Sequence, residues 1–558
     1  MASIPVRPTS ALGSLAWNFP IPLKISEGCR TSGTRSFKLL AQRTDIRLLP
    51  DGNFTGLTNT SNGLIYFRGI PFADPPVGAL RWQAPNSPPT KNLGHLTTTD
   101  FGPACIDTTQ TNSGATTSED CLYGNVYLPI GTTADAGLPV LVYFYGGGFE
   151  SGRTNKYPPE NLVLASKSPF IMATFGYRLG QFGFLAGSVV HDNGVPNVGL
   201  LDQKAALQWV QKYIANFGGD PGAVTIWGQS AGAASVVYHL IANAGNANPP
   251  FSQAIGDSPP ILYLPNYNDA FSENLFSTFA ANAGCGTTKV RNTTAAIMQC
   301  LRAATVKTIA TAGSQTLQNF PTELYPFGPV FDGAYIQQRP VEALLSGNFA
   351  QVPVLFGSNT DEGANWSAKL ADPANTSSPT ATETTVNNFL TGQYPTLSSA
   401  SFQEAIDQYY PLSDYNGSFS LQGQQMYGEM RFICSAVLAS NAFANSNQLA
   451  YQYHWDNPTL GSTHSDELVV FFNQTIVFDS PDQTLALAMR DYWTSFITSG
   501  TPTSDATGAP TWPTVDGENT EHGVRLLLQP GNIAVEAVSD DLSQRCTFWH
   551  DLAGQLFT

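Results

Sequence analysis

The chain has 558 residues, and its 42 acidic against 26 basic side chains give a formal net charge of −16, which argues against a nucleic-acid-binding protein. Only 12% of the residues are charged and 42% are hydrophobic, and the 50 glycines and 39 prolines indicate a large globular protein with many turns. No stretch approaches the ~18 consecutive apolar residues of a membrane helix, so we expect no stable membrane insertion.

The first 44 residues differ in charge from the rest of the chain. Residues 1–43 contain six basic side chains and a single acid, whereas the remainder carries a large excess of acids. The apolar run Ala11–Leu23 is interrupted by a glycine, an asparagine and two prolines, which makes it a weak secretory signal. We therefore predict an N-terminal extension over residues 1–44, either signal-like or disordered, and a single domain over residues 45–558.

Strands and helices alternate along the body of the chain. The runs Leu138–Tyr145 (LPVLVYFY) and Phe170–Phe175 (FIMATF) are apolar, β-branched and aromatic, which predicts buried strands. Apolar residues recur at helix spacing from Asp202 to Phe217, and the turn Gly218–Pro221 then leads into the strand-like run Ala223–Trp227. This alternation predicts an α/β fold with a large, mostly parallel sheet covered by helices on both faces.

A Gly-x-Ser-x-Gly motif, Gly228 to Gly232, lies between that strand and an Ala/Val-rich helical stretch. The pattern alone is weak, but the strand-to-helix context is the one in which a serine is exposed on a sharp, strained turn. The glycines allow the strand and the helix to approach closely, and the helix N-terminus adds positive potential. Ser230 is therefore a candidate nucleophile.

An activated serine needs a base, and in this type of fold the order along the chain is serine, acid, histidine. The histidines with enough preceding sequence are His454, His464, His522 and His550. His454 lies inside the strand-like run Ala450–Trp455, where a packed or hydrogen-bonded role is expected. His464 follows the loop after that strand and is the better candidate for the base.

The acid should also follow a strand. The run Val352–Phe356 leads into a loop that contains Asp361 and Glu362. On spacing alone, either carboxylate could orient the base.

Seven cysteines and seven glycosylation sequons point to an oxidising compartment. No Cys-x-x-Cys is present, which argues against zinc ribbons and thioredoxin-type redox sites. Six cysteines, an even number, lie in the body of the chain, and Cys29 lies in the N-terminal extension. The sequons are at Asn53, Asn59, Asn292, Asn365, Asn375, Asn416 and Asn473. Together these features predict a secreted, disulfide-bonded glycoprotein, although its N-terminal signal is weak.

Several longer motifs resemble the type-B carboxylesterase/lipase family, which also contains the cholinesterases, and most of all its fungal secreted carboxylesterases. The resemblance covers about residues 45–555. Its motifs are residues 67–73 (FRGIPFA), 118–122 (SEDCL), 145–149 (YGGGF), 177–180 (YRLG), 197–203 (NVGLLDQ), 217–232, 329–333 (PVFDG) and 357–363 (GSNTDEG).

The resemblance implies an α/β-hydrolase fold and a set of site residues. Ser230 would be the nucleophile, His464 the base, and Glu362 rather than Asp361 the acid. The backbone N–H groups of Gly147, Gly148 and Ala231 would form the oxyanion hole.

The resemblance also implies the disulfides Cys105–Cys121, Cys285–Cys300 and Cys434–Cys546, which leave Cys29 unpaired or removed. Ser258 is similar to a second serine that the family has near the triad; its alternative role is that of a solvated turn hydroxyl.

Some residues depart from the cholinesterase pattern. Gln229 stands where cholinesterases have a glutamate, and the segment between Cys105 and Cys121 contains no tryptophan to stack on a quaternary ammonium. We therefore do not expect choline esters to be substrates. Tyr145, Phe149 and Phe182 suggest an apolar acyl or alcohol pocket.

The sequence thus predicts a serine carboxylic ester hydrolase that forms an acyl-enzyme with a small-molecule ester. The alternatives are an interfacial lipase, an acyl-transferring or lactone-forming enzyme of secondary metabolism, and a non-catalytic recognition protein similar to neuroligins. No P-loop, His-Glu-x-x-His or complete Gly-x-Gly-x-x-Gly motif occurs, so we expect no cofactor and no metal.

The residues between Cys105 and Cys121 bear on the choice between esterase and lipase. They read IDTTQTNSGATTSED, with one aliphatic residue and no apolar helical stripe. They therefore cannot form an amphipathic lid, and we expect soluble short-chain or aromatic esters to be the substrates.

Overall fold

A computed structural model describes residues 44–245, 247–286, 293–322, 324–515 and 523–558. Most of the predicted N-terminal extension, Cys29, the sequon at Asn292 and His522 lie outside these ranges. The residues from Gln42 to Thr558 form one compact unit.

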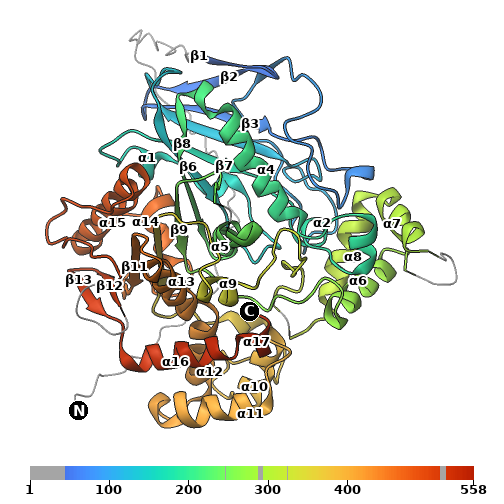
Figure 1. The fold of residues 1–558 in the computed structure, drawn as a ribbon, viewed down its shortest axis with the longest axis vertical. Coiled ribbons are helices and arrows are strands. Elements are labelled where there is room, and N and C mark those ends of the chain that lie inside the picture. The colour runs from blue at the N-terminus through green and yellow to red at the C-terminus, as the bar shows by residue number, and fades with distance from the viewer. Residues whose placement is uncertain (1–43, 246, 287–292, 323, 516–522) are drawn as a thin grey trace, which may run out of the picture. The chain divides into compact units, whose positions relative to one another are not determined.

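A single 13-stranded sheet runs through this unit (Figure 1). Its strands are β1 (Thr44–Leu49), β2 (Gly52–Asn59), β3 (Leu64–Pro71), β4 (His95–Thr97), β5 (Tyr123–Pro129), β6 (Leu138–Phe144), β7 (Ile171–Phe175), β8 (Gly219–Gln229), β9 (Gln253–Asp257), β10 (Val354–Asn359), β11 (Ala450–Trp455), β12 (Val524–Gln529) and β13 (Asn532–Ala537).

The sheet is parallel in its centre and antiparallel towards its ends. The order is β1-β2-β3-β5-β7-β6-β8-β9-β10-β11-β12-β13, with β4 paired to β2. The strands from β7 to β12 all run parallel, whereas β1, β2, β3, β5 and β7 form an antiparallel flank and β13 closes the other end. The predicted mostly parallel sheet is therefore confirmed.

The helices fall into groups beside this sheet. They are α1 (Glu160–Val163), α2 (Gly180–Gly183), α3 (Ser188–Asn193), α4 (Val198–Tyr213), α5 (Ala231–Gly245), α6 (Ala270–Asn282), α7 (Thr294–Ala303), α8 (Val306–Leu317), α9 (Pro340–Leu345), α10 (Glu383–Gln393), α11 (Ser399–Glu404), α12 (Phe419–Gly428), α13 (Cys434–Asn445), α14 (Val469–Phe472), α15 (Ser480–Ser499), α16 (Asp540–Asp551) and α17 (Ala553–Leu556). Figure 1 shows α6, α7 and α8 in one group and α10, α11 and α12 in another.

Helices cover both faces of the central strands, as successive residues of β8 show. The ring of Trp227 packs on Phe471 and Phe472 of α14, at 5.1 and 5.6 Å between ring centroids. Gly228, the next residue, faces α5, where a Cβ would lie 2.2 Å from the carbonyl carbon of Gly232. Because side chains alternate along a strand, α14 and α5 lie on opposite faces of the sheet.

The predicted elements around the motif are confirmed, with one correction. The run 138–145 contains β6, which ends at Phe144, and the run 170–175 contains β7, which begins at Ile171. The helix expected over 202–217 begins earlier, as α4 at Val198, and is followed by a 3₁₀ turn, Ile214–Phe217. The turn expected over 218–221 is shorter than predicted, because β8 begins at Gly219, which pairs with Leu138. Gly218 alone makes the reversal, with φ of +87°.

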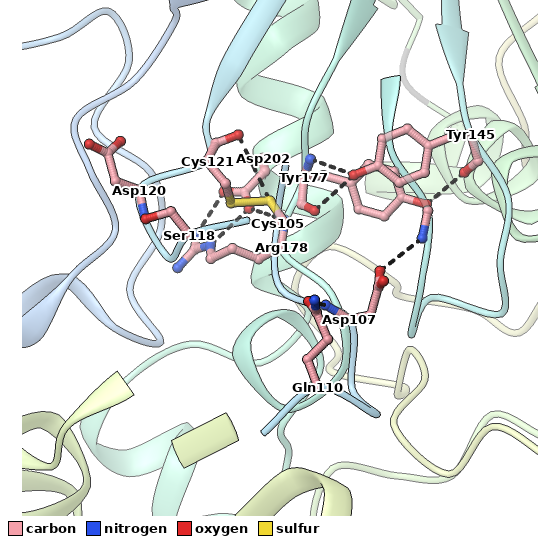
Figure 2. Close-up of a disulfide and its surroundings, with 11 residues drawn as sticks. Cys105, Asp107, Gln110, Ser118, Asp120, Cys121, Tyr145, Tyr177, Arg178 and Asp202 are labelled. Atoms are coloured by element: carbon pink, nitrogen blue, oxygen red, sulfur yellow. Dashed lines mark hydrogen bonds and ion pairs between the residues drawn. A yellow bond between two sulfur atoms is a disulfide. The ribbon is translucent and has the colours of Figure 1, made fainter. Parts of the chain in front are cut away.

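Three disulfides link the cysteine pairs that the family resemblance implies. They are Cys105–Cys121, Cys285–Cys300 and Cys434–Cys546. Figure 2 shows the first of them beside the buried ion pair of Arg178 with Asp202, whose closest atoms are 2.7 Å apart, and near the stacked rings of Tyr145 and Tyr177.

The segment between Cys105 and Cys121 contains no helix, and all of its residues are described. A β-bridge joins Ala104 to Thr117 at its base. Farther along, the hydroxyl of Thr311 in α8 donates to the carbonyl of Thr111 at 3.0 Å. The segment therefore rests against α8 rather than forming an amphipathic flap. None of the helices in the described ranges combines the length and apolar character that a bilayer span requires.

Candidate active site

Ser230 occupies a strained turn between β8 and α5. Its φ is +58°, in the left-handed region that a serine rarely adopts, and its N–H donates to the carbonyl of Asp257 in β9 at 2.9 Å. The flanking glycines permit this turn: a Cβ on Gly232 would lie 2.0 Å from the carbonyl oxygen of Phe144 in β6. The sequence therefore places Ser230, the candidate nucleophile, at the carboxyl edge of the central strands, with 8% of its surface exposed.

Three backbone N–H groups near this turn have no acceptor in the described part of the chain. They belong to Gly147, Gly148 and Ala231. Gly147 and Gly148 have φ of +122° and +64°, which turns the backbone after β6, and Ala231 is the first residue of α5. Gly148 and Ala231 line the same pocket as Ser230. Such N–H groups can stabilise a developing negative charge on an oxygen.

Glu362 and His464 meet beyond the ends of two neighbouring strands. Parallel pairing of β10 with β11 sets Asn359 opposite Trp455, so the loops that follow lie side by side. A bridge between Asp361 and Thr463 joins these loops, and there the Asp361 N–H donates to the carbonyl of Ser462 at 2.9 Å. The Glu362 carboxylate then lies 2.6 Å from Nδ1 of His464.

The Glu362 carboxylate is fixed on both of its oxygens. While Oε2 contacts His464, Oε1 accepts from the hydroxyl of Ser258 at 2.5 Å and from the N–H of Asn359 at 2.7 Å. The Glu362 side chain is fully buried. Ser258 is also fully buried, so the alternative interpretation of its side chain as a solvated turn hydroxyl is wrong. These contacts fix the carboxylate in one position, and its contact with Nδ1 holds the imidazole in one orientation.

The other nitrogen of His464 faces Gln229, the residue before Ser230. Its Nε2 lies 3.3 Å from the side-chain nitrogen of Gln229, and no hydrogen bond joins Ser230 Oγ to the imidazole among the described residues. The rings of Phe432 and Trp366 pack on the imidazole, at 4.4 and 5.0 Å between centroids. With Nδ1–H donated to Glu362, Nε2 carries the lone pair that can accept a proton.

The competing candidates have other positions. His454 lies in β11, where its ring contacts the hydroxyl of Thr360 at 2.8 Å and the carboxylate of Glu536 at 2.8 Å, as expected for a packed histidine. Burial lowers the pKa of His550 to about 4. Asp361 is exposed and joins the loops through its main chain. Of the two adjacent carboxylates, Glu362 is the one in contact with His464.

Buried carboxyl groups that the sequence did not single out lie close to these residues. Burial raises the pKa of Asp257, at the end of β9, to about 8, although Trp227 donates its indole N–H to this carboxylate at 2.7 Å. Burial and the charges of Asp257 and Glu362 raise the pKa of Glu467 well above its usual range. Glu467 follows His464 by three residues and accepts from Asn359 at 2.6 Å. No motif marks an acid of this kind, because its pKa depends on tertiary burial.

One pocket opens onto Ser230. It encloses about 870 Å³, counted with its open mouth, and its walls are mostly apolar and aromatic. Phe149 lines it as expected, whereas Tyr145 and Phe182 do not. Tyr145 stacks on Tyr177 in the core, and Phe182, in α2, belongs to a buried apolar cluster with residues of α6 and α8, so both serve packing rather than substrate contact. The Cys105–Cys121 segment does not line the pocket either.

This chain is similar to several known proteins over most of its length. Residues 44–549 match the model of the carboxylesterase family. Among curated relatives, the pyrethroid hydrolase Ces2e of Rattus norvegicus is 30% identical over 86% of this chain and 85% of its own length. Secreted lipase 1 of Botryotinia fuckeliana is 31% identical over 80% of this chain and 83% of its own length. Among solved structures, EstA of Aspergillus niger has a TM-score of 0.81 and 30% identity, covering 92% of this chain and 99% of that one.

Proposed function

This chain belongs to the carboxylesterase family and is a carboxylic ester hydrolase, and from that premise we propose that it works through Ser230, His464 and Glu362. The observation that carries the proposal is the 2.6 Å contact of Glu362 with Nδ1 of His464, whose other ring nitrogen contacts Gln229, the residue before Ser230. Acid, base and nucleophile come from three different strand ends, which is the arrangement that acyl transfer needs.

In the acylation step, Ser230 Oγ attacks the ester carbonyl carbon while its proton passes to Nε2 of His464. The new Oγ–C bond pushes the carbonyl electrons onto oxygen, and the N–H groups of Gly147, Gly148 and Ala231 stabilise that charge. The Glu362 carboxylate stabilises the imidazolium without taking its proton.

Collapse of this intermediate breaks the bond to the alcohol. The leaving oxygen takes the proton from Nε2, and the acyl group stays on Ser230. Water then attacks the acyl-enzyme with His464 as the base, and the acid is released with Ser230 restored. The balance is one ester and one water converted to one acid and one alcohol.

We assign soluble short-chain or aromatic esters as the substrates and an extracellular location. Support for the first comes from the apolar pocket and from the Cys105–Cys121 segment, which has no helix to cover it. Support for the second comes from the three disulfides and from the secreted relative in Botryotinia fuckeliana. That relative is a lipase, so an interfacial lipase is the alternative function.

A fluorophosphonate probe tests the proposal directly, because it labels an activated serine covalently. We expect one labelled peptide, that of Ser230, and loss of both labelling and esterase activity in Ser230→Ala. Ser272→Ala is the matched control, since Ser272 lines the same pocket but its hydroxyl donates to the carbonyl of Asn266 at 2.7 Å. Labelling of a different serine, or more than about a hundredth of the wild-type kcat in Ser230→Ala, would reject the assignment.

A further inference from the structure

Arg431 is the one charged side chain among the described residues that line the pocket at Ser230. It lies in the π-helical turn η7 (Glu429–Ile433), between α12 and α13, and only 8% of it is exposed. The next residue, Phe432, lines the same pocket and packs on the ring of His464 at 4.4 Å. Arg431 is therefore on the wall that carries the base.

The charge of Arg431 has no acidic partner among the described residues. Glu429, two residues earlier, is already occupied: Arg545 donates to both of its oxygens, at 2.6 and 2.8 Å, and Tyr410 donates a third hydrogen bond at 2.8 Å. The acid closest in sequence therefore cannot neutralise Arg431.

Aromatic groups surround the Arg431 guanidinium instead. It lies 5.6 Å from the ring centroid of Tyr427 and 5.8 Å from that of Phe432. The hydroxyl of Tyr394 hydrogen-bonds to it and donates its own proton to the carbonyl of Ile261 at 2.6 Å. Ring faces and one phenol oxygen satisfy only part of a group with five N–H donors.

A guanidinium stays charged at every pH that a protein tolerates. The desolvation cost of a buried guanidinium therefore cannot be removed by loss of a proton. Burial without an anion is unfavourable, and in a pocket wall this imbalance is removed when an anion enters. The low dielectric of the surrounding rings strengthens such a pairing, and the planar fork of arginine matches a carboxylate with two parallel hydrogen bonds.

We propose that Arg431 binds a carboxylate carried by the ester itself, so that the substrate class comprises esters with a free carboxylate on their acyl or their alcohol half. This inference rests on the proposed function, since it assigns the specificity of the same site. Arg431 is a specificity-determining residue that anchors the far end of the substrate while Ser230 attacks the carbonyl.

Two matched pairs of esters test the assignment and separate the two halves. For the acyl half, p-nitrophenyl hydrogen glutarate is compared with p-nitrophenyl hexanoate. For the alcohol half, 4-acetoxybenzoate is compared with 4-methylphenyl acetate. The readout for each pair is the ratio of kcat/KM for the anionic ester to kcat/KM for the neutral ester, measured in the wild type and in each variant.

In Arg431→Met we expect this ratio to fall by about thirtyfold or more in the pair whose carboxylate reaches position 431. The ratio should fall less in Arg431→Lys, because lysine keeps the charge but lacks the planar fork of the guanidinium. Arg68→Met is the matched control: Arg68 also lies over an aromatic ring, 4.3 Å from the centroid of Tyr66, but outside the pocket. Its ratios should equal those of the wild type.

The inference is wrong if Arg431→Met leaves both ratios unchanged, or if Arg68→Met lowers them equally. Failure of the proposed function has a different signature, namely neutral-ester hydrolysis that survives Ser230→Ala. Should Arg431→Met fail to fold, the wild type still decides: free glutarate should inhibit p-nitrophenyl acetate hydrolysis competitively, and glutaramide should not. Equal inhibition by the two compounds would overturn the assignment.

Discussion

The hydroxyl of Ser258 donates to one oxygen of the Glu362 carboxylate, at 2.5 Å, while the other oxygen contacts His464. Ser258 directly follows β9 and thus fixes Glu362, in the loop after β10, while Glu362 contacts His464, in the loop after β11. Because Glu362 holds the imidazole through this contact, we expect replacement of Glu362 to change the orientation of His464.

Glu362→Gln should therefore lower kcat by ~10³ or more, since the amide can present its N–H₂ to His464 and select the wrong tautomer. Asp361→Asn is the matched control, because that neighbouring carboxylate is exposed and makes its contacts through the main chain. Steady-state kinetics on p-nitrophenyl acetate distinguish the two variants. The assignment of the acid fails if Asp361→Asn is the more damaged enzyme.

Gln229→Glu should move the acid limb of the kcat/KM profile to higher pH. A carboxylate placed about where the Gln229 amide lies, 3.3 Å from Nε2, stabilises the protonated imidazole, and the base must be neutral to accept a proton. Gln229→Met, which removes the amide without adding charge, should leave the limb where it is. Equal profiles for Gln229→Glu and Gln229→Met would show that the side chain at 229 does not act on His464.

Glu150→Gln should make the protein less sensitive to pH between about 4 and 8. Burial raises the pKa of Glu150 to about 8, against ~4.3 for an unfolded glutamate. The neutral carboxyl stabilises the fold fully below the lower value, and this contribution is lost as the pH rises through the higher one. The amide never ionises and keeps the acceptor for the N–H of Phe327, at 3.0 Å.

The measurement for Glu150→Gln is the decrease in Tm from pH 5 to pH 8. The decrease in Tm should be larger in the wild type than in Glu150→Gln. In Glu404→Gln, at an exposed position in α11, it should equal that of the wild type. A decrease in Glu150→Gln as large as in the wild type would mean that the carboxyl is ionised across this range.

The rate on partly soluble esters should follow ordinary saturation, with no jump as the substrate passes its solubility limit. The disulfide-closed segment 106–120 has no helix, and it does not line the pocket at Ser230. Initial rates on p-nitrophenyl butyrate across its solubility limit, and on emulsified long-chain triglyceride, check this. A clear jump at the limit would favour the interfacial lipase.

Local patterns predicted the elements that carry the site, because those patterns reflect local physics. A continuous apolar run identifies a buried strand, and a Gly-x-Ser-x-Gly between strand and helix identifies the turn at Ser230. The position of His464 just after β11 followed from the same logic. Between Asp361 and Glu362, however, spacing gave no preference, and only the family resemblance favoured Glu362.

Other features depend on tertiary packing that one sequence does not reveal. Tyr145 and Phe182 were expected in the pocket because aromatic side chains are common in apolar pockets, but both are packed in the core. Arg431 lies about 200 residues from Ser230 in a turn without a motif, so nothing local marks it as a pocket residue. The contact of Gln229 with His464 likewise exists only because β8 and the loop after β11 converge.

The bridge between Asp361 and Thr463 has a consequence for recombination with relatives. An exchange point between residues 364 and 449 would take Glu362 from one parent and His464 from another. The loops after β10 and β11 would then come from different proteins, and their main-chain pairing would have to form between sequences that did not evolve together. Exchange points before β10 or after His464 inherit both loops from one parent. Chimeras of the first kind should therefore fold yet hydrolyse poorly, while those of the second kind keep the acid and the base in register.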